Sequence, residues 1–398
     1  MVTFPVIGVV GGGQLARMMA GPAVELGIGL HVLAEGPDVS AVAAVAHSTV
    51  GDYRDPEALR AFAATVDVLT FDHEHVPGEL LDELEGEGIA IHPSPRALRH
   101  AQDKLVMRRA VEELGLPNPA WRAVRTAADV EAFAEETGWP VVLKTPRGGY
   151  DGKGVLVLRG SAGLAAAEPW FTGGELLAEQ FVPFSRELSV LVARRPSGEA
   201  VTWPVVESIQ VDSVCDEVIA PAPDLPGDVS DAVTAAALRL ASRLGVTGVM
   251  AVELFETPGS GVGYLVNELA MRPHNSGHWT MDGAVTSQFE QHLRAVLDLP
   301  LGATDAISRH IVMKNVLGGR NTDIYGAYQS AFSSGPSAKV HFYGKGVRPG
   351  RKIGHVNALA GPEEPLADVR ARATRVAAIL RDGTTTPPTD QDQVKGTQ

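Results

Sequence analysis

The sequence is short of cysteine and of basic side chains, and each shortage excludes a class of protein. Its one cysteine, Cys215, cannot form a disulfide within the chain, which argues against a disulfide-stapled secreted domain. Only 34 Lys and Arg stand against 48 Asp and Glu, so the formal net charge of −14 would repel nucleic acid and anionic membrane surfaces. We therefore expect any basic cluster to serve a local anionic ligand.

The chain also has no long apolar run and no charged-then-apolar leader at its N-terminus. We expect a cytoplasmic protein that makes no contact with a membrane. No internal repeat is visible. With 398 residues, of which 44% are hydrophobic and 21% charged, the chain is long enough for two or three globular domains.

What the chain does contain is glycine placed beside charge. An apolar stretch ends on Lys144 and runs into a loop that carries glycines at 148, 149, 152 and 154 together with Lys153. Glycines let backbone N–H groups close on an anion, and a lysine at each end adds positive charge. No Gly-Lys-Ser/Thr of a P-loop follows, and no His-Arg-Asp or Asp-Phe-Gly of a kinase. The loop indicates a nucleotide phosphate site on another fold.

The pattern of apolar runs predicts the organisation of the chain. Residues 1–100 alternate strands at 6–10, 29–34, 66–71 and 88–91 with helical stretches, typical of an open, mostly parallel α/β domain. Residues 101–300 begin with a helix near Lys104 and then place strands at 141–144, 155–158, 187–194, 249–255 and 264–270 around one amphipathic helix, 230–244. Residues 301–383 hold short mixed elements and a basic segment, 345–352. The polar stretch 384–398 is predicted to be a disordered tail.

A glycine-rich turn follows the first predicted strand. Gly11-x-Gly13-x-x-Ala16, with Glu35 at the end of the second strand, satisfies the dinucleotide-binding fingerprint. The fingerprint alone is weak, because any strand-to-helix turn of this kind offers free N–H groups and a positive helix end to a phosphate. A dinucleotide, the phosphate of a substrate and a purely structural turn all remain open at this point, and we favour the substrate phosphate.

Two acids interrupt apolar strands further along. If the strands at 249–255 and 264–270 form a hairpin that pairs Thr257 with Tyr264, Glu253 lies opposite Glu268 with Cβ atoms about 5 Å apart. Adjacent carboxylates repel unless a cation lies between them, and oxygen ligands suit Mg²⁺ that bridges nucleotide phosphates. One acid could instead pair with a buried arginine or face solvent. The glycine loop upstream favours the metal.

Together these motifs resemble a known family. The loop at 148–154, Glu179-Gln180-Phe181-Val182 followed by Glu187, the two acids, and Arg272-Pro273-His274-Asn275-Ser276-Gly277-His278 are similar to the N5-carboxyaminoimidazole ribonucleotide synthetases (PurK), ATP-grasp enzymes of purine biosynthesis. The resemblance runs from Gly11 to His355 and implies an α/β and α+β fold in three domains. These are a pre-ATP-grasp domain like the N-terminal domain of biotin carboxylase over 1–100, a two-part ATP-grasp domain over 101–300 and a small C-terminal domain over 301–383.

The resemblance implies an ATP site and a metal site. Lys104 and Lys144 would bind phosphates. The loop that covers them would consist of Gly149, Tyr150, Asp151, Gly152, Lys153, Gly154 and Val155. The backbone of Glu179, Gln180, Phe181 and Val182 would bind adenine, and the ionised carboxylate of Glu187 would accept hydrogen bonds from the ribose hydroxyls. Glu253 and Glu268, with Asn267 beside them, would hold Mg²⁺, or Mn²⁺ in its place.

The resemblance also implies a site for aminoimidazole ribonucleotide. Its residues would be Gly12, Gly13, Gln14, Leu15, Glu74, Arg272, His274, Asn275, Lys345, Arg351 and Lys352. The 5′-phosphate would supply the anion for the N–H groups of the glycine turn, and Glu74 would bind the ribose. The basic residues would complete the sites for that phosphate and for the group derived from bicarbonate, which accounts for a basic cluster in an acidic protein.

The implied reaction is phosphorylation of bicarbonate by ATP to carboxyphosphate, followed by attack of the substrate's exocyclic amine. Asp151, Arg272 and His274 would be the catalytic residues, Arg272 by neutralising charge and the other two by positioning the amine and moving its proton. The partners would be small molecules and a second copy of the chain, in a homodimer.

Two other functions stay open. A related ATP-grasp ligase could activate formate or an amino acid, although the segments 274–278 and 348–352 argue against it. A nucleotide-binding regulator could have lost turnover, although Lys144, Asp151, Glu253 and Glu268 are all intact. Asp72 and Gln210 depart from the family pattern and receive no role. His73-Glu74-His75 has no third metal ligand nearby in sequence and is not assigned to zinc.

Overall fold

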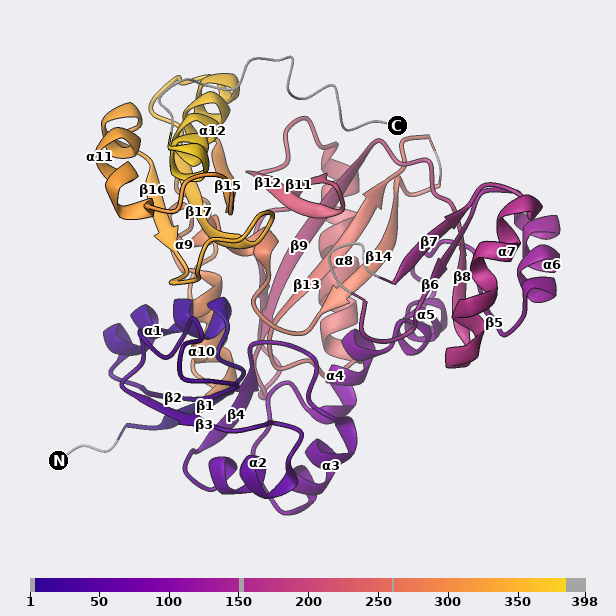
Figure 1. Cartoon of the computed structure of the whole chain (residues 1–398), viewed down its shortest axis with the longest axis horizontal. Helices are drawn as coiled ribbons and strands as arrows, with labels where there is room; N and C mark the ends of the chain where they lie inside the picture. Colours follow the sequence, from indigo (N-terminus) through magenta and orange to yellow (C-terminus); the bar gives the residue numbers. More distant parts are fainter. Residues whose placement is uncertain (1–3, 150–153, 260, 384–398) are drawn as a thin grey trace.

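Three β-sheets organise the computed structural model, which describes residues 4–149, 154–259 and 261–383 (Figure 1). Tyr150, Asp151, Gly152 and Lys153 of the expected loop, and the tail at 384–398, lie outside the described residues.

The first sheet is parallel, in the order β3-β2-β1-β4. Its strands are β1 (Val6–Val10), β2 (Gly29–Ala34), β3 (His47–Val50) and β4 (Val68–Phe71), and its helices are α1 (Gln14–Leu26), α2 (Pro56–Ala63), α3 (Gly78–Gly86) and α4 (Pro95–Gln102). Helices α2, α3 and α4 pack on one face of the sheet. Helix α1 packs on the other together with α10 (Gln288–Val296), which comes from much later in the chain. The parallel α/β prediction is confirmed.

One predicted strand of this region is wrong. The run 88–91 makes only a single bridge, between Ile91 and Leu69. Gly88 has a φ of +91°, which is outside the β region, and Pro93 has no N–H to donate to a neighbouring strand. Only one residue of this run, Ile91, therefore pairs with β4.

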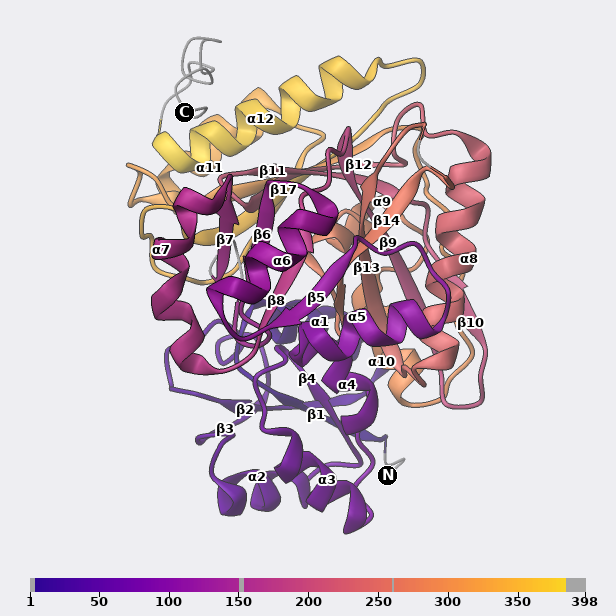
Figure 2. The ribbon, with the colours of Figure 1, turned by 90° about the vertical axis from the view of Figure 1, so that its right-hand side faces the viewer.

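The second sheet is small and antiparallel, in the order β5-β8-β6-β7. Its strands are β5 (Trp121–Val124), β6 (Val141–Lys144), β7 (Val155–Leu158) and β8 (Leu176–Gln180), covered by α6 (Ala127–Thr137) and α7 (Leu164–Ala167). The expectation that 141–144 and 155–158 surround the same helix as the later strands is wrong. They have a core of their own, and Figure 2 shows β6, β7 and α6 standing in front of the large sheet.

The third sheet is large and runs β14-β13-β9-β11-β12-β15-β17-β16, with β10 paired to β9. Its strands are β9 (Arg186–Arg194), β10 (Ala200–Thr202), β11 (Val206–Val211), β12 (Val214–Ala220), β13 (Gly248–Glu256), β14 (Tyr264–Ala270), β15 (Ile311–Leu317), β16 (Lys339–Phe342) and β17 (Lys352–Leu359). Helix α8 (Gly227–Arg243) buries the predicted stripe of Val233, Ala236 and Leu240 against one face. Trp203 and Trp279 lie in the core on the other face.

The C-terminal strands thus extend the large sheet. Helices α11 (Ile324–Ser334) and α12 (Leu366–Asp382) pack over them in a separate apolar cluster. Two elements complete the frame of the site: α5 (Lys104–Glu113), which begins at Lys104 after the cap Asp103, and the short α9 (Thr280–Gly283). No described helix has the length and apolarity to cross a lipid bilayer.

The β13–β14 hairpin pairs Glu253 with Glu268 as predicted, but not by the predicted register. Tyr264 pairs with Glu256 rather than with Thr257, because the connecting turn, 257–263, is one residue longer than predicted. Leu254 then pairs with Val266, and a β-bulge at Asn267 brings the two acids back opposite each other.

Candidate active site

A cleft of about 1260 Å³ opens where the three sheets meet. Its walls come from the turn after β1, the loop after β4, the start of α5, β13, β14, the loop that follows β14, and the segment 345–352 before and into β17. A second, smaller cavity of about 320 Å³ adjoins it over β6 and β8. Lys104, Glu187, Asn267 and Glu268 line both, so the two cavities meet at the acidic residues.

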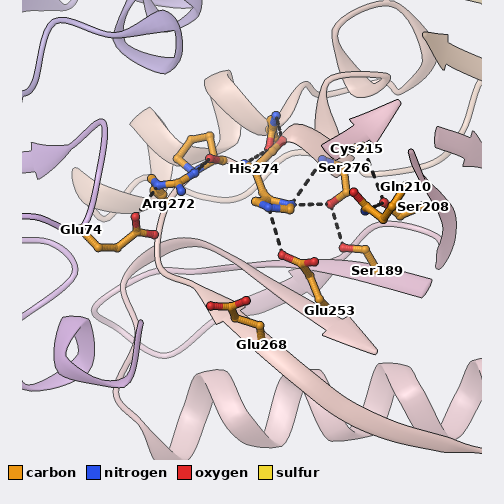
Figure 3. Close-up of polar contacts among 12 residues, drawn as sticks. Glu74, Ser189, Ser208, Gln210, Cys215, Glu253, Glu268, Arg272, His274 and Ser276 are labelled. Atoms are coloured by element: carbon orange, nitrogen blue, oxygen red, sulfur yellow. Dashed lines mark hydrogen bonds and ion pairs between the residues drawn. The ribbon is translucent and has the colours of Figure 1, made fainter. Parts of the chain in front are cut away.

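The two acids line the cleft with different partners, and Figure 3 shows Glu253 facing His274. Glu268 forms an ion pair with Lys104 at the start of α5. Glu253 lies 3.2 Å from Nε2 of His274. Burial would raise the pKa of Glu253, but His274, Lys104 and Arg272 together outweigh it and the net shift is downward. Glu253 is therefore stabilised as an anion by its neighbours, and Glu268 is bound to a lysine.

The bulge explains how Asn267 can stand beside Glu268. Consecutive residues of a regular strand point to opposite faces, yet Asn267 and Glu268 both line the cleft. Two carboxylates and an amide oxygen are hard oxygen donors of the kind that Mg²⁺ takes. No group of three or more His, Cys, Asp or Glu that could hold a metal is found among the described residues, so a cation here would need further oxygen ligands from a bound molecule.

His274 is fixed by the turn that follows β14. The Ser276 N–H donates to its Nδ1 at 3.3 Å, and the Ser276 hydroxyl lies 2.8 Å from the same atom. An accepting Nδ1 leaves the proton on Nε2, which faces Glu253. Ser276 in turn lies 2.7 Å from the Ser189 hydroxyl on β9 (Figure 3). The ring therefore has a defined orientation toward the cleft.

Lys144, at the end of β6, contacts Glu179 and the side-chain amide of Asn267, which both line the smaller cavity. Its Nζ lies 2.7 Å from Glu179 and 3.4 Å from the amide oxygen of Asn267. Glu179 is buried, and its carboxylate also binds Arg108 of α5. Burial would raise the pKa of Glu179, but the charges of Lys144 and Arg108 lower it to about 2.

The side chain of Glu179 thus turns inward, while Gln180, Phe181 and Val182 line the smaller cavity beyond it. Two aromatic rings stack there, Phe184 on Phe255 with centroids 4.5 Å apart. The cavity therefore offers apolar walls next to an edge of backbone. Glu187 lies at its mouth, and burial, with the charge of Glu253, raises its pKa to about 7. Half of this carboxyl would be protonated at neutral pH, which departs from the fully ionised group that we expected.

At the other end of the cleft Glu74 accepts a hydrogen bond of 2.8 Å from Nε of Arg272. Burial would lower the pKa of Arg272, but Glu74 and the other nearby acids raise it. Residues far apart in the sequence lie together here. The lining includes Gly13, Gln14, Leu15, Glu74, Arg272, His274, Asn275, Lys345, Arg351 and Lys352.

Gly12 is the one predicted substrate residue that does not line the cleft, and its N–H is already used by Glu35 at 3.0 Å. The N–H of Ala16, one turn into α1, donates to Asp72 at 2.8 Å. Asp72 lies so close that a Cβ on Gly13 would meet its Oδ2 at 1.9 Å. Two acidic side chains therefore stand at this helix start, for which we favoured a substrate phosphate among three alternatives from sequence.

Sequence reasoning missed Arg108 and the β11–β12 turn. Arg108 interrupts the apolar stripe of Leu105 and Val111 on α5, and that interruption was the available signal. Ser213, at the turn, lines both cavities and has a φ of +62°. Cys215 is buried, and burial raises the pKa of its thiol to about 11.

Comparisons with known proteins fit this geometry. Three family models match in succession: a ribonucleotide synthetase preATP-grasp domain over residues 4–102, an ATP-grasp domain over 109–289 and a phosphoribosylaminoimidazole carboxylase C-terminal domain over 311–368. A protein of Mycobacterium tuberculosis called N5-carboxyaminoimidazole ribonucleotide synthase is 49% identical over 384 residues, covering 95% of this chain and 88% of its own length. One of Synechococcus elongatus with the same name is 42% identical and covers 88% of both chains.

Solved structures agree. The N5-carboxyaminoimidazole ribonucleotide synthetase of Thermus thermophilus superposes with a TM-score of 0.84 at 37% identity, over 93% of this chain and 98% of the other. The enzyme of Aspergillus clavatus in complex with ADP and 5-aminoimidazole ribonucleotide gives 0.85 at 31% identity, over 96% and 99%.

Proposed function

This chain belongs to the N5-carboxyaminoimidazole ribonucleotide synthase family of ATP-grasp ligases, and we propose that its cleft and the adjoining cavity divide the work of that reaction. The enzyme uses ATP to carboxylate 5-aminoimidazole ribonucleotide with bicarbonate in purine biosynthesis, which yields N5-carboxyaminoimidazole ribonucleotide, ADP and phosphate. The observation that carries the division is that the two cavities meet at Lys104, Glu187, Asn267 and Glu268.

ATP would occupy the smaller cavity. Its adenine fits the apolar space beside Phe181, Val182 and Phe255, where backbone groups after β8 can bind the ring edge. Glu187 would accept a hydrogen bond from a ribose hydroxyl and lose its proton when it does so. The phosphates would then point to Lys104 and Lys144, and the loop at 149–155 would cover them.

Glu253, Glu268 and Asn267 would hold Mg²⁺ against those phosphates. Their oxygen donors fit the ion, and the nucleotide would complete its ligand shell. Lys104, now paired with Glu268, would be released toward phosphate oxygen when the cation arrives. Bound Mg²⁺ supplies neutralising charge to the transferring phosphoryl group.

The ribonucleotide would lie in the larger cleft. Lys345, Arg351 and Lys352 would bind its phosphate, since they are the cations of the C-terminal wall. The glycine turn, flanked by Glu35 and Asp72, suits hydroxyl or amine donors better than phosphate, because these two acids already accept from the N–H groups of Gly12 and Ala16. We therefore assign Gly13, Gln14, Leu15 and Glu74 to the sugar and base.

The chemistry needs little covalent help from the protein. A bicarbonate oxygen attacks the γ-phosphorus and ADP leaves; the substrate amine then attacks the carbonyl carbon of carboxyphosphate, phosphate leaves and the amine loses a proton. Arg272 would neutralise the carboxyphosphate, and His274 would position the amine or take its proton. Asp151, in the loop outside the described residues, is proposed for the same proton.

ADP release tests this assignment. Purified enzyme with Mg-ATP is assayed with bicarbonate alone, with the ribonucleotide alone and with both. Turnover should need both substrates and form a carboxylated product. Release that ignores the ribonucleotide but responds to another amine would overturn the substrate assignment.

We also propose that the enzyme acts in the cytoplasm as a homodimer. The excess of acidic residues keeps it off nucleic acid and anionic membranes, which supports a soluble small-molecule enzyme. Sedimentation velocity over a range of concentrations should give about twice the chain mass of 41.9 kDa, and a monomer at all of them would exclude the dimer.

A further inference from the structure

Arg108 lies behind the site and touches neither cavity. Its side chain comes from the middle of α5 and has no exposed surface. A buried guanidinium is costly unless every donor is used, so its partners show what it does.

The partners of Arg108 come from three places. Its Nε binds the carboxylate of Glu179 on β8. Its Nη1 donates to the side-chain oxygen of Asn118 at 2.8 Å and to the carbonyl of Val266 at 2.7 Å, and its Nη2 donates to the carbonyl of Asn267 at 2.9 Å. The planar fork of arginine can reach such a set, whereas the single ammonium of lysine cannot.

Two of these partners are the carbonyls of the β-bulge. Asn267 is the extra residue between the pairs Leu254–Val266 and Glu253–Glu268. A bulge leaves backbone groups without ladder partners, and Arg108 supplies donors to both carbonyls there. The bulge is also what lets Asn267 and Glu268 face the cleft together.

Another partner of Arg108, Glu179, also binds Lys144, a lysine of the proposed nucleotide site. Glu179 binds Arg108 through one oxygen and Lys144 through the other, at 2.7 Å. Lys144 in turn lies 3.4 Å from the Asn267 amide oxygen. One guanidinium therefore fixes the bulge of β14 and, through Glu179, the amine at the end of β6, although these strands belong to different sheets.

We propose that Arg108 is a positioning residue that holds Asn267, Glu268 and Lys144 in the arrangement that receives the metal and the nucleotide phosphates. This inference rests on the roles proposed above for those three residues. Arg108 meets no substrate itself, and its effect on catalysis passes entirely through the groups it holds.

Nucleotide binding without turnover tests the inference. Calorimetry gives the Kd of ADP with Mg²⁺ and with EDTA. The ratio of the Kd in EDTA to the Kd with Mg²⁺ reports how strongly the metal tightens nucleotide binding. Arg108→Met should reduce this ratio about tenfold and lower kcat up to about 100-fold, while the KM for the ribonucleotide changes less than threefold. Arg108→Lys should recover part of the loss, because it restores the charge beside Glu179 but not the fork.

The matched control is Arg109→Met, since Arg109 is the exposed neighbour on the same helix. It should leave both Kd values unchanged. Should Arg108→Met not fold, Asn118→Ala removes one anchor of the guanidinium without touching either cavity, and it should reduce the ratio about threefold. A wild-type ratio in either variant, at a normal melting temperature, would overturn the inference.

A further variant separates the two routes. Glu179→Gln in the Arg108→Met background removes an acid that has lost one of its two cationic partners and keeps only Lys144, but it does not supply donors to the two carbonyls of the bulge. If the ratio then returns to the wild-type value, charge balance at Glu179 was the whole effect and the bulge role is wrong. If the wild type is active and the Arg108 variants keep its Kd ratio, this inference alone is wrong. If ADP release by the wild type does not depend on the ribonucleotide, the proposed function is wrong.

Discussion

Nζ of Lys345 lies 2.6 Å from the side-chain oxygen of Gln14, a residue 331 positions earlier in the chain. The contact closes the cleft between the turn after β1 and the segment that leads into β17. Burial lowers the pKa of Lys345, and the nearby Asp72 opposes that shift. Because the amide of Gln14 is neutral, this contact does not cancel the charge of the half-buried Lys345, which can still bind an anionic ligand.

Lys345→Met should therefore weaken binding of the ribonucleotide. Loss of one charged hydrogen bond corresponds to roughly 1.5–3 kcal/mol, so the KM for the ribonucleotide should rise about 10- to 100-fold while the KM for ATP stays within about twofold. Steady-state kinetics with each substrate varied measures both. Lys339→Met, an exposed lysine on β16, is the control and should change neither. Equal rises in both constants would show that Lys345 does not serve the ribonucleotide alone.

The glycine turn gives a second prediction. A Cβ on Gly13 would meet the Asp72 carboxylate, which receives the Ala16 N–H. Gly13→Ala should push Asp72 from the helix start, raise the KM for the ribonucleotide at least about tenfold and lower the melting temperature, because a buried acid loses its partner. Gly21, in the middle of α1, has open space around its Cβ position. Gly21→Ala should leave the KM unchanged, because the added Cβ meets no neighbouring atom of the substrate site. A Gly13→Ala enzyme with normal kinetics would remove the turn from the substrate site.

Glu179 predicts a pH dependence of stability. Its pKa is about 2 in the folded chain against an ordinary value of 4.5, so its ionised form stabilises the fold above pH 4.5. This contribution is lost as the pH falls from 4.5 toward 2, when the carboxyl is protonated and Arg108 and Lys144 lose their counter-charge. The melting temperature of the wild type should exceed that of Glu179→Gln by a margin that is constant from pH 7 to 5 and shrinks below pH 4.5. A constant margin down to pH 3 would contradict the ion pair.

The strands that sequence placed correctly are those with a clear local pattern. β1, β2, β6, β7 and β14 occur at the predicted bounds, because β-branched runs between glycine, proline and charge define both ends. For these strands the information lies within a few residues of the element itself. The facing pair Glu253 and Glu268 was also predicted, but from a register that is wrong in the outer part of the hairpin and that the bulge at Asn267 restores.

What sequence could not place depends on distant partners. The Asn267 bulge shifts the hairpin by one residue, and its carbonyls are met by Arg108, more than 150 positions away. The inward turn of Glu179 and the raised pKa of Glu187 likewise depend on side chains from other strands. Local patterns cannot report such contacts, and the family resemblance assigned ligand roles without these supporting residues.

Glu268 gives the sharpest test of the metal site. It faces Glu253 across the hairpin and now holds Lys104, so its removal takes away a proposed metal ligand and leaves that lysine unpaired beside the phosphates. Glu268→Gln keeps the shape of the side chain and should lower kcat at least about 1,000-fold, a loss of about 4 kcal/mol in transition-state stabilisation, with little change in melting temperature.

Two comparisons make the result specific. Glu199→Gln, at the exposed β9–β10 turn, breaks a surface ion pair with Arg195, lies in the lining of neither cavity and should leave kcat unchanged. In Glu268→Gln the Kd of ADP measured in EDTA should be close to wild type, while the tightening that Mg²⁺ brings should disappear. If Glu268→Gln kept wild-type turnover, the cation would have to be held elsewhere, and Lys104 and Glu268 would form a structural pair at the mouth of the nucleotide cavity.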